Sequence, residues 1–148
     1  MRASPISLQD ITFLKVQLET NKNFKEQQGP YDFNATRCRY SIRHGKGKGE
    51  NEWWVGFDFE VLEGEKKSPP YTLEVIAMGL FSISEKIKED RREELIFENG
   101  AALVYGAIRE MVTNLSYRFP MGRLMLPTLS FVGEFNKKKE QEEKDSQE

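Results

Sequence analysis

The stretch GLFSISEKIKEDRREELIFENGAALVYGAIREMVTNLSYRFPMGRLMLPTLSF, residues 79–131, decides the fold of this chain. It opens with a short apolar hinge, GLFSI, at residues 79–83 and then follows one long helical pattern. It ends in the apolar segment RFPMGRLMLPTLSF at residues 118–131. Pro120 ends the helix and Pro127 interrupts the segment that follows, because proline cannot continue a hydrogen-bonded helix.

The helical pattern covers residues 91–118. Small residues at positions 100–102, 106 and 107 allow close contact on more than one side of this helix. We therefore expect the sheet on one side and a partner subunit on the other. The apolar positions recur at alternating steps of four and three, which defines one helix face: Phe97, Ala101, Val104, Ile108, Met111 and Leu115, widened by Leu103, Tyr105 and Val112.

Four strand-like segments precede the helix. Residues 10–19 alternate in polarity, but the phase changes between Phe13 and Leu14, which indicates a β-bulge or a twisted edge. A polar linker at residues 20–30 leads to a second alternating segment, residues 31–44, which also changes phase once: Tyr31, Phe33 and Ala35, then Cys38, Tyr40 and Ile42.

The third and fourth segments are residues 53–61, the cleanest alternation in the chain, and residues 71–78. Ile76, Met78 and Leu80 put apolar side chains on the second face of the fourth segment, so something must cover that face. Four strands with short connections, followed by helix, predict an α+β domain with an antiparallel sheet.

The chain of 148 residues fits a single domain, which we place at residues 1–135. Residues 136–148 contain no apolar side chain and predict a charged, disordered C-terminal tail.

Composition argues against several classes of partner. The net charge is only −2, so no strong field would attract DNA or an acidic membrane. The N-terminus lacks the apolar run of a signal peptide, and no segment approaches the length of a transmembrane helix. A single cysteine excludes an internal disulfide and fits a reducing compartment. We expect a cytoplasmic protein with no nucleic-acid partner and no direct membrane insertion.

Candidate catalytic and metal-binding groups are few. His44 is the only histidine and has no second ligand at metal-site spacing. Cys38 lies on an alternating segment without a histidine to pair with, so we expect it to be packed rather than nucleophilic. The GKGKGE run lacks the spacing and the final Ser or Thr of a phosphate-binding loop. The sequence predicts no catalytic residue, no metal, no cofactor and no enzyme.

One alternative is a sheet that stacks nucleic-acid bases. It has no RNP-type signature and an unsuitable overall charge. The residues that suggest it are Trp53, Trp54, Phe57 and Phe59 beside Arg37, Arg39 and Arg43.

The order of several motifs resembles the SecB family of bacterial protein-export chaperones. The match spans residues 10–135 and is specific after Tyr71. The motifs are DITF at residues 10–13, GLFSI, IRE at residues 108–110, Phe119 with Pro120, and Leu124, Leu126, Pro127 and Phe131.

The resemblance implies a four-stranded antiparallel sheet, a long helix and a short C-terminal helix, assembled as a homotetramer that is a dimer of dimers. It implies apolar grooves that hold unfolded or precursor polypeptides, and a fourth strand that contributes to subunit association through Leu73, Val75 and Ala77. The positions on or beside the client groove are Phe24, Tyr71, Leu80, Phe81, Ile83, Tyr105, Leu124, Leu126 and Phe131.

The resemblance also implies docking to the translocase motor, SecA, through Asp10 and Glu74. Other positions of that surface differ, since Leu14 replaces an acid and Thr72 a leucine. In the linker, Gln28 stands where the family commonly has a tryptophan. Two roles follow from the same resemblance. One is an ATP-independent holdase for protein export, and the other is a dedicated chaperone of the antitoxin of a toxin–antitoxin pair.

Overall fold

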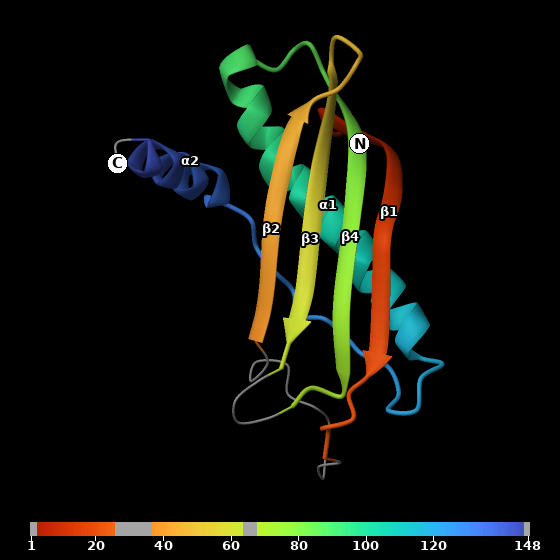
Figure 1. Ribbon diagram of the computed structural model, residues 1–148. Coiled ribbons are helices and arrows are strands. Elements are labelled where there is room, and N and C mark those ends of the chain that lie inside the picture. Colours follow the sequence, from red (N-terminus) through yellow and green to blue (C-terminus); the bar gives the residue numbers. More distant parts are fainter. Residues whose placement is uncertain (1–2, 26–36, 64–67, 147–148) are drawn as a thin grey trace.

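A computed structural model describes residues 3–25, 37–63 and 68–146. The four strands form one antiparallel sheet in the order β1-β4-β3-β2, and α1 crosses one face of it diagonally (Figure 1). The α+β class predicted from the sequence is confirmed. The elements are β1 (Ile6–Thr20), β2 (Arg37–Lys46), β3 (Glu52–Leu62), β4 (Tyr71–Ile83), α1 (Glu89–Ser116) and α2 (Glu134–Asp145).

Strand β1 contains the bulge that the change of phase predicted. Its register against β4 shifts between Phe13 and Lys15, so Leu14 is the extra residue. A second shift, between Leu8 and Asp10, was not predicted. Because of the first bulge, Phe13 and Val16 lie opposite the alternate β4 residues Ala77 and Val75, on the same face of the sheet.

The two central strands divide the sheet into a covered and an open face. In β4 every second residue from Tyr71 to Ile83 is buried, and the residues between them are partly exposed. Ile76, Met78 and Leu80 lie on the open face, which no described element of this chain covers. The sequence predicted that something covers this second face of β4, and none of the described residues does so.

Helix α1 packs on the covered face with a stripe close to the predicted one. Ala101, Val104 and Ile108 are fully buried as expected, whereas Met111 and Leu115 are partly exposed. Gly100 permits close packing, since a Cβ atom there would lie 2.7 Å from Val55 Cγ2. Of the small residues, Gly100 thus allows close packing of α1 against the sheet. The side chain of Leu103 faces outward.

The C-terminal segment, residues 118–133, runs back over the covered face without joining the sheet. Side chains from other parts of the chain form hydrogen bonds with its main chain. Tyr71 Oη donates a hydrogen bond to Gly122 O at 2.7 Å, and Tyr105 Oη donates one to Pro127 O at 2.7 Å. Ser116 Oγ accepts a hydrogen bond from Leu124 N at 2.7 Å. The segment contributes three buried side chains to the core: Leu124, Leu126 and Phe131.

Helix α2 is the short C-terminal helix that the resemblance implied, and it occupies residues 134–145, where the charged tail was expected from residue 136. Phe135 is buried and anchors the first turn, and Gly133 adopts the left-handed conformation that turns the chain into the helix. Lys137 pairs with Glu134 at 2.9 Å within the helix. Spacing of opposite charges by one turn supports a helix without any apolar face.

Strand β2 is described from Arg37 onward, so the predictions for Gln28, Tyr31, Phe33 and Ala35 lie outside the described residues. Cys38 is exposed, not packed as expected. Its end of β2 lies away from α1, which crosses toward β1 there (Figure 1). Although the residue is exposed, partial desolvation raises the pKa of its thiol above the usual value, which disfavours the nucleophilic thiolate.

Candidate functional site

Most side chains of the predicted client groove lie close together, but they are buried in the hydrophobic core and do not line an open groove. Leu80 differs because it lies on the open face of β4, and Phe24 lies partly exposed after β1. The remaining predicted groove residues are all buried between the sheet, α1 and the C-terminal segment: Tyr71, Phe81, Ile83, Tyr105, Leu124, Leu126 and Phe131.

Tyr105 is the centre of this cluster. Its ring stacks on Phe57 with a centroid distance of 5.4 Å and meets Phe131 edge-on at 5.9 Å. Burial raises the pKa of its hydroxyl far above the usual value, and the nearby Arg109 only partly opposes that shift. The hydroxyl therefore remains a neutral donor to Pro127 O, and the C-terminal segment closes the groove.

An open pocket remains beside this cluster, between the outer side of α1 and the C-terminal segment. Met125 is 55% exposed, while its neighbours Leu124 and Leu126 are buried. The alternation in this segment was a signal that the sequence analysis did not use. The pocket is lined by Gly106, Arg109, Glu110, Thr113, Asn114, Met125 and Leu126.

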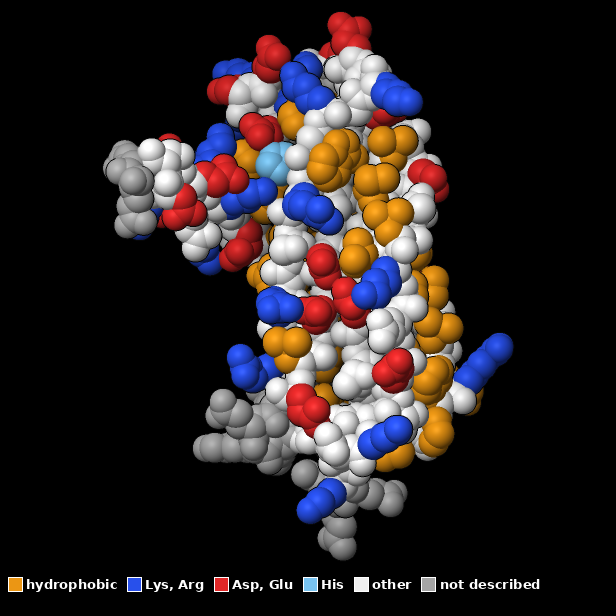
Figure 2. Space-filling view, viewed as in Figure 1, with side chains coloured by type: hydrophobic (Ala, Val, Ile, Leu, Met, Phe, Trp, Pro, Cys, Tyr) orange, Lys and Arg blue, Asp and Glu red, His pale blue; other side chains and the backbone are white. Residues whose placement is uncertain are grey.

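Further apolar side chains are exposed along α1 and β1. Leu103 on α1 is 45% exposed, and Leu14 in the β1 bulge is 61% exposed. Strand β1 stands at the end of the sheet and pairs only with β4 among the described strands, so one row of its main-chain groups is unpaired. Figure 2 shows hydrophobic side chains gathered along the right edge of the view, where β1 lies. Gathered apolar side chains on a protein surface make this edge a candidate interaction site.

Comparison with known proteins agrees with this architecture. No family model matches the sequence, and no curated protein is similar in sequence. A solved structure of a SecB-like chaperone from Mycobacterium tuberculosis, in complex with a ChAD peptide from the HigA1 antitoxin, superposes with a TM-score of 0.54 at 18% identity. The alignment covers 85% of this chain and 91% of that chain. This chain has a SecB-like fold. A Streptococcus agalactiae protein of unknown function gives a TM-score of 0.46 at 8% identity, over 85% of this chain and 99% of that one.

Within the SecB-like fold, the predicted subunit contacts of β4 lie inward. Leu73, Val75 and Ala77 are buried on the covered face, under α1. The alternation of the strand explains this, because every odd residue of β4 points to the helix. The surface that this strand leaves free is its other face, with Ile76 and Met78.

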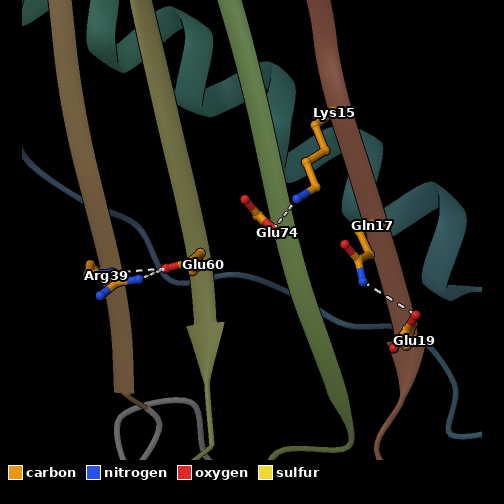
Figure 3. A network of polar contacts seen from close by, with 6 residues as sticks. All are labelled: Lys15, Gln17, Glu19, Arg39, Glu60 and Glu74. Atoms are coloured by element: carbon orange, nitrogen blue, oxygen red, sulfur yellow. Dashed lines mark hydrogen bonds and ion pairs between the residues drawn. The ribbon is translucent and has the colours of Figure 1, made fainter.

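The predicted docking residues lie on the open face, where charges are paired. Glu74 forms an ion pair with Lys15 of β1, and Arg39 of β2 pairs with Glu60 of β3 (Figure 3). Asp10 has no polar partner among the described residues and stands opposite Leu80 in the register. Lys15 pairs with Glu74, and Glu60 lies opposite Glu74 in the β3–β4 register, so acidic and basic side chains are interspersed on this part of the SecB-like sheet.

The upper part of the open face is apolar. Leu80 lies directly opposite Trp54 in the β3–β4 register, and Met78 lies opposite Gly56. Figure 2 shows hydrophobic side chains gathered over this region. Trp53, Phe57 and Phe59 are buried on the other face, so the base-stacking alternative keeps only Trp54 as an accessible aromatic of this set.

His44 lies at the edge of the SecB-like core between β2 and α1. Its Nε2 is 2.8 Å from Glu93 Oε1, and its ring meets Phe97 edge-on at 5.2 Å. In the described part of the chain, no three His, Cys, Asp or Glu side chains are grouped as metal ligands. No helix of the described ranges is both long and apolar enough to span a membrane.

Proposed function

We propose that this protein is a SecB-like molecular chaperone that binds unfolded or precursor polypeptides without ATP and supports protein export. The exposed apolar surface at the α1 pocket carries the proposal, because it lies on a SecB-like fold and includes the exposed side chain of Met125. In this proposal the protein binds polypeptides and is not an enzyme. Export clients would meet it in the cytoplasm, where they are synthesised.

Shallow apolar contacts fit such a role. Burial of apolar surface contributes roughly 25 cal/mol per Å², so several small contacts give useful affinity while each remains reversible. Met125 lines the pocket and is exposed, and Met121 of the same segment is also exposed. Methionine adapts its shape to different partners, which suits recognition of many client sequences.

We propose that copies of the chain associate, in the dimer-of-dimers homotetramer that the resemblance implies. Leu73, Val75 and Ala77 are covered in the single chain, so we assign the contact to the β1 edge and the outer side of α1. The exposed large apolar side chains there are Leu8, Leu14 and Val16 on β1 and Leu103 on α1. A long unpaired edge strand needs a cover, and a second β1 would supply it.

The experiment is suppression of aggregation, with light scattering to measure both client aggregation and particle size. Met125→Asp puts a charge at the pocket and is expected to weaken protection several-fold without changing particle size. Leu103→Asp is expected to reduce the particle size. Val132→Asp is the matched control, since Val132 is 81% exposed and outside the pocket. Equal protection by the parent and the Met125 variant would exclude this pocket.

A dedicated antitoxin chaperone is the second candidate. The Mycobacterium tuberculosis chaperone of the same fold was solved with an antitoxin peptide. In addition, the ion pair of Glu74 with Lys15 removes acidity from the predicted SecA-docking surface. Pull-down of purified SecA at low salt separates the two roles. Binding that depends on Asp10 and Glu74 would favour export, and selective binding of one antitoxin would favour the dedicated chaperone.

A further inference from the structure

Helix α2 is held to the described chain through its first turns. Phe135 is its only buried residue, at 5% exposure. Its ring centroid lies 5.5 Å from that of Phe97 and 5.9 Å from that of His44. A short charged helix is marginally stable in water by itself. The seating of one aromatic side chain therefore decides whether α2 stays on the molecule.

The site that holds the Phe135 ring is formed by residues of β2 and α1. The hydrogen bond between His44 Nε2 and Glu93 Oε1 joins these two elements. Phe97 is 2% exposed and packs edge-on against the imidazole. The other ring nitrogen of His44, Nδ1, is buried and has no hydrogen-bond partner among the described residues. The site that holds Phe135 thus includes an unpaired polar atom.

One side chain of the same helix also reaches the outer edge of β2. Gly47 N donates to Glu52 O, and hydrogen-bonded and non-hydrogen-bonded pairs alternate along an antiparallel ladder. Ile42, opposite Phe57, falls in a non-hydrogen-bonded pair, so its main-chain groups point away from β3. Lys138 Nζ of α2 donates to this carbonyl at 3.3 Å. A side chain of α2 therefore occupies a free edge acceptor.

A peptide that adds a strand to the edge of a sheet uses two features. One is a free main-chain acceptor on that edge, and the other is an adjacent pocket for a side chain. We propose that α2 is an autoinhibitory latch on such a site. Phe135 and Lys138 occupy the place where an extended polypeptide would pair with the edge of β2 and insert an aromatic side chain between His44 and Phe97. This inference rests on the proposed binding of unfolded polypeptides, and it names the segment of this chain that competes with the client.

The first test measures peptide affinity by fluorescence anisotropy with the full chain. The probe is a labelled heptapeptide of alternating threonine and valine with one central phenylalanine, and its matched form has alanine at the centre. Phe135→Ala is expected to bind the phenylalanine peptide about tenfold more tightly than the parent, because removing the latch raises the fraction of competent molecules. Val132→Ala is the control and should match the parent. No gain for Phe135→Ala, or an equal gain for both peptides, would overturn the latch.

The second test uses His44, the only histidine of the chain, as a reporter in NMR spectra. In Phe135→Ala the imidazole signals should move when the phenylalanine peptide is added, whereas the parent should need about ten times more peptide. Binding without movement of these signals would place the peptide elsewhere and contradict the proposal. If Phe135→Ala does not fold, Lys138→Ala replaces it, since that variant frees the edge carbonyl and keeps the aromatic anchor.

The outcomes also separate the latch from the proposed function. Equal suppression of client aggregation by the parent and Phe135→Ala, with no gain in peptide affinity, would remove the latch and leave the chaperone. A gain in peptide affinity without any suppression of aggregation would leave the latch site and remove the chaperone.

Discussion

The two helices of this protein are stabilised in opposite ways. Helix α1 has nine buried residues, spread from Ile96 to Ser116, and forms one wall of the core. Helix α2 has one, Phe135. The first helix cannot leave without unfolding the domain, whereas the second can leave at the cost of the contacts of two side chains, Phe135 and Lys138. This difference teaches that stability and regulation reside in different helices, and each prediction below tests a part of it.

The largest effect is expected where α1 meets the sheet. Ile108 is fully buried, so Ile108→Ala should lower the free energy of unfolding by about 2–5 kcal/mol through lost burial and a residual cavity. Urea denaturation followed by far-ultraviolet circular dichroism measures it. Glu110→Ala, two residues away and exposed, is the control and should change little. A loss below about 1 kcal/mol for Ile108→Ala would show that this helix is not part of a tightly packed core.

The next effect concerns the link between α1 and the C-terminal segment. Ser116 is fully buried and its Oγ accepts the hydrogen bond of Leu124 N. Ser116→Ala leaves that buried N–H without its acceptor, which should cost about 1–3 kcal/mol. The same denaturation experiment measures the loss, and hydrogen exchange should locate faster exchange at Leu124. Unchanged exchange there would mean that another group accepts the hydrogen bond.

The sequence predicted α1 and the sheet well because both bury a regular pattern. The spacing of Ala101, Val104 and Ile108 defined the buried face, and the change of phase at Leu14 defined a bulge. Helix α2 has no such pattern, since its charges pair along the helix and only Phe135 is buried. A periodicity argument cannot find a helix that depends on a single anchor.

The candidate site was harder to predict than the fold. The resemblance supplied positions such as Tyr105 and Leu126, but their exposure depends on how residues 118–133 fold back over them. That return is fixed by hydrogen bonds from side chains far away in the sequence, such as Tyr71 to Gly122. The exposed Met125 follows from the same arrangement. Long-range contacts of this kind leave no local signal in a single sequence.

Removing Phe135, the anchor of α2, should lower the global free energy of unfolding less than Ile108→Ala or Ser116→Ala does. Phe135→Ala is expected to cost about 1.4 kcal/mol or less, the free energy of a tenfold equilibrium between docked and undocked α2. Hydrogen exchange of residues 134–145 should become fast, while that of α1 stays protected. A global loss as large as that of Ile108→Ala would show that α2 belongs to the core and would contradict the comparison of the two helices.

The smallest effect is expected within α2 itself. Lys138 and Glu142 are one turn apart with an N–O distance of 4.0 Å, and Glu142→Ala should change the helix by only about 0.2–0.5 kcal/mol. Lys138→Ala removes the same pair, the hydrogen bond to Ile42 O and the cation–π contact with Phe97, so its additional effect measures the contacts of Lys138 with β2 and α1 together. The measurement is exchange of the α2 amides in both variants at matched salt. If Glu142→Ala releases α2 as fully as Lys138→Ala, then intrahelical charge pairing rather than the edge contact positions this helix.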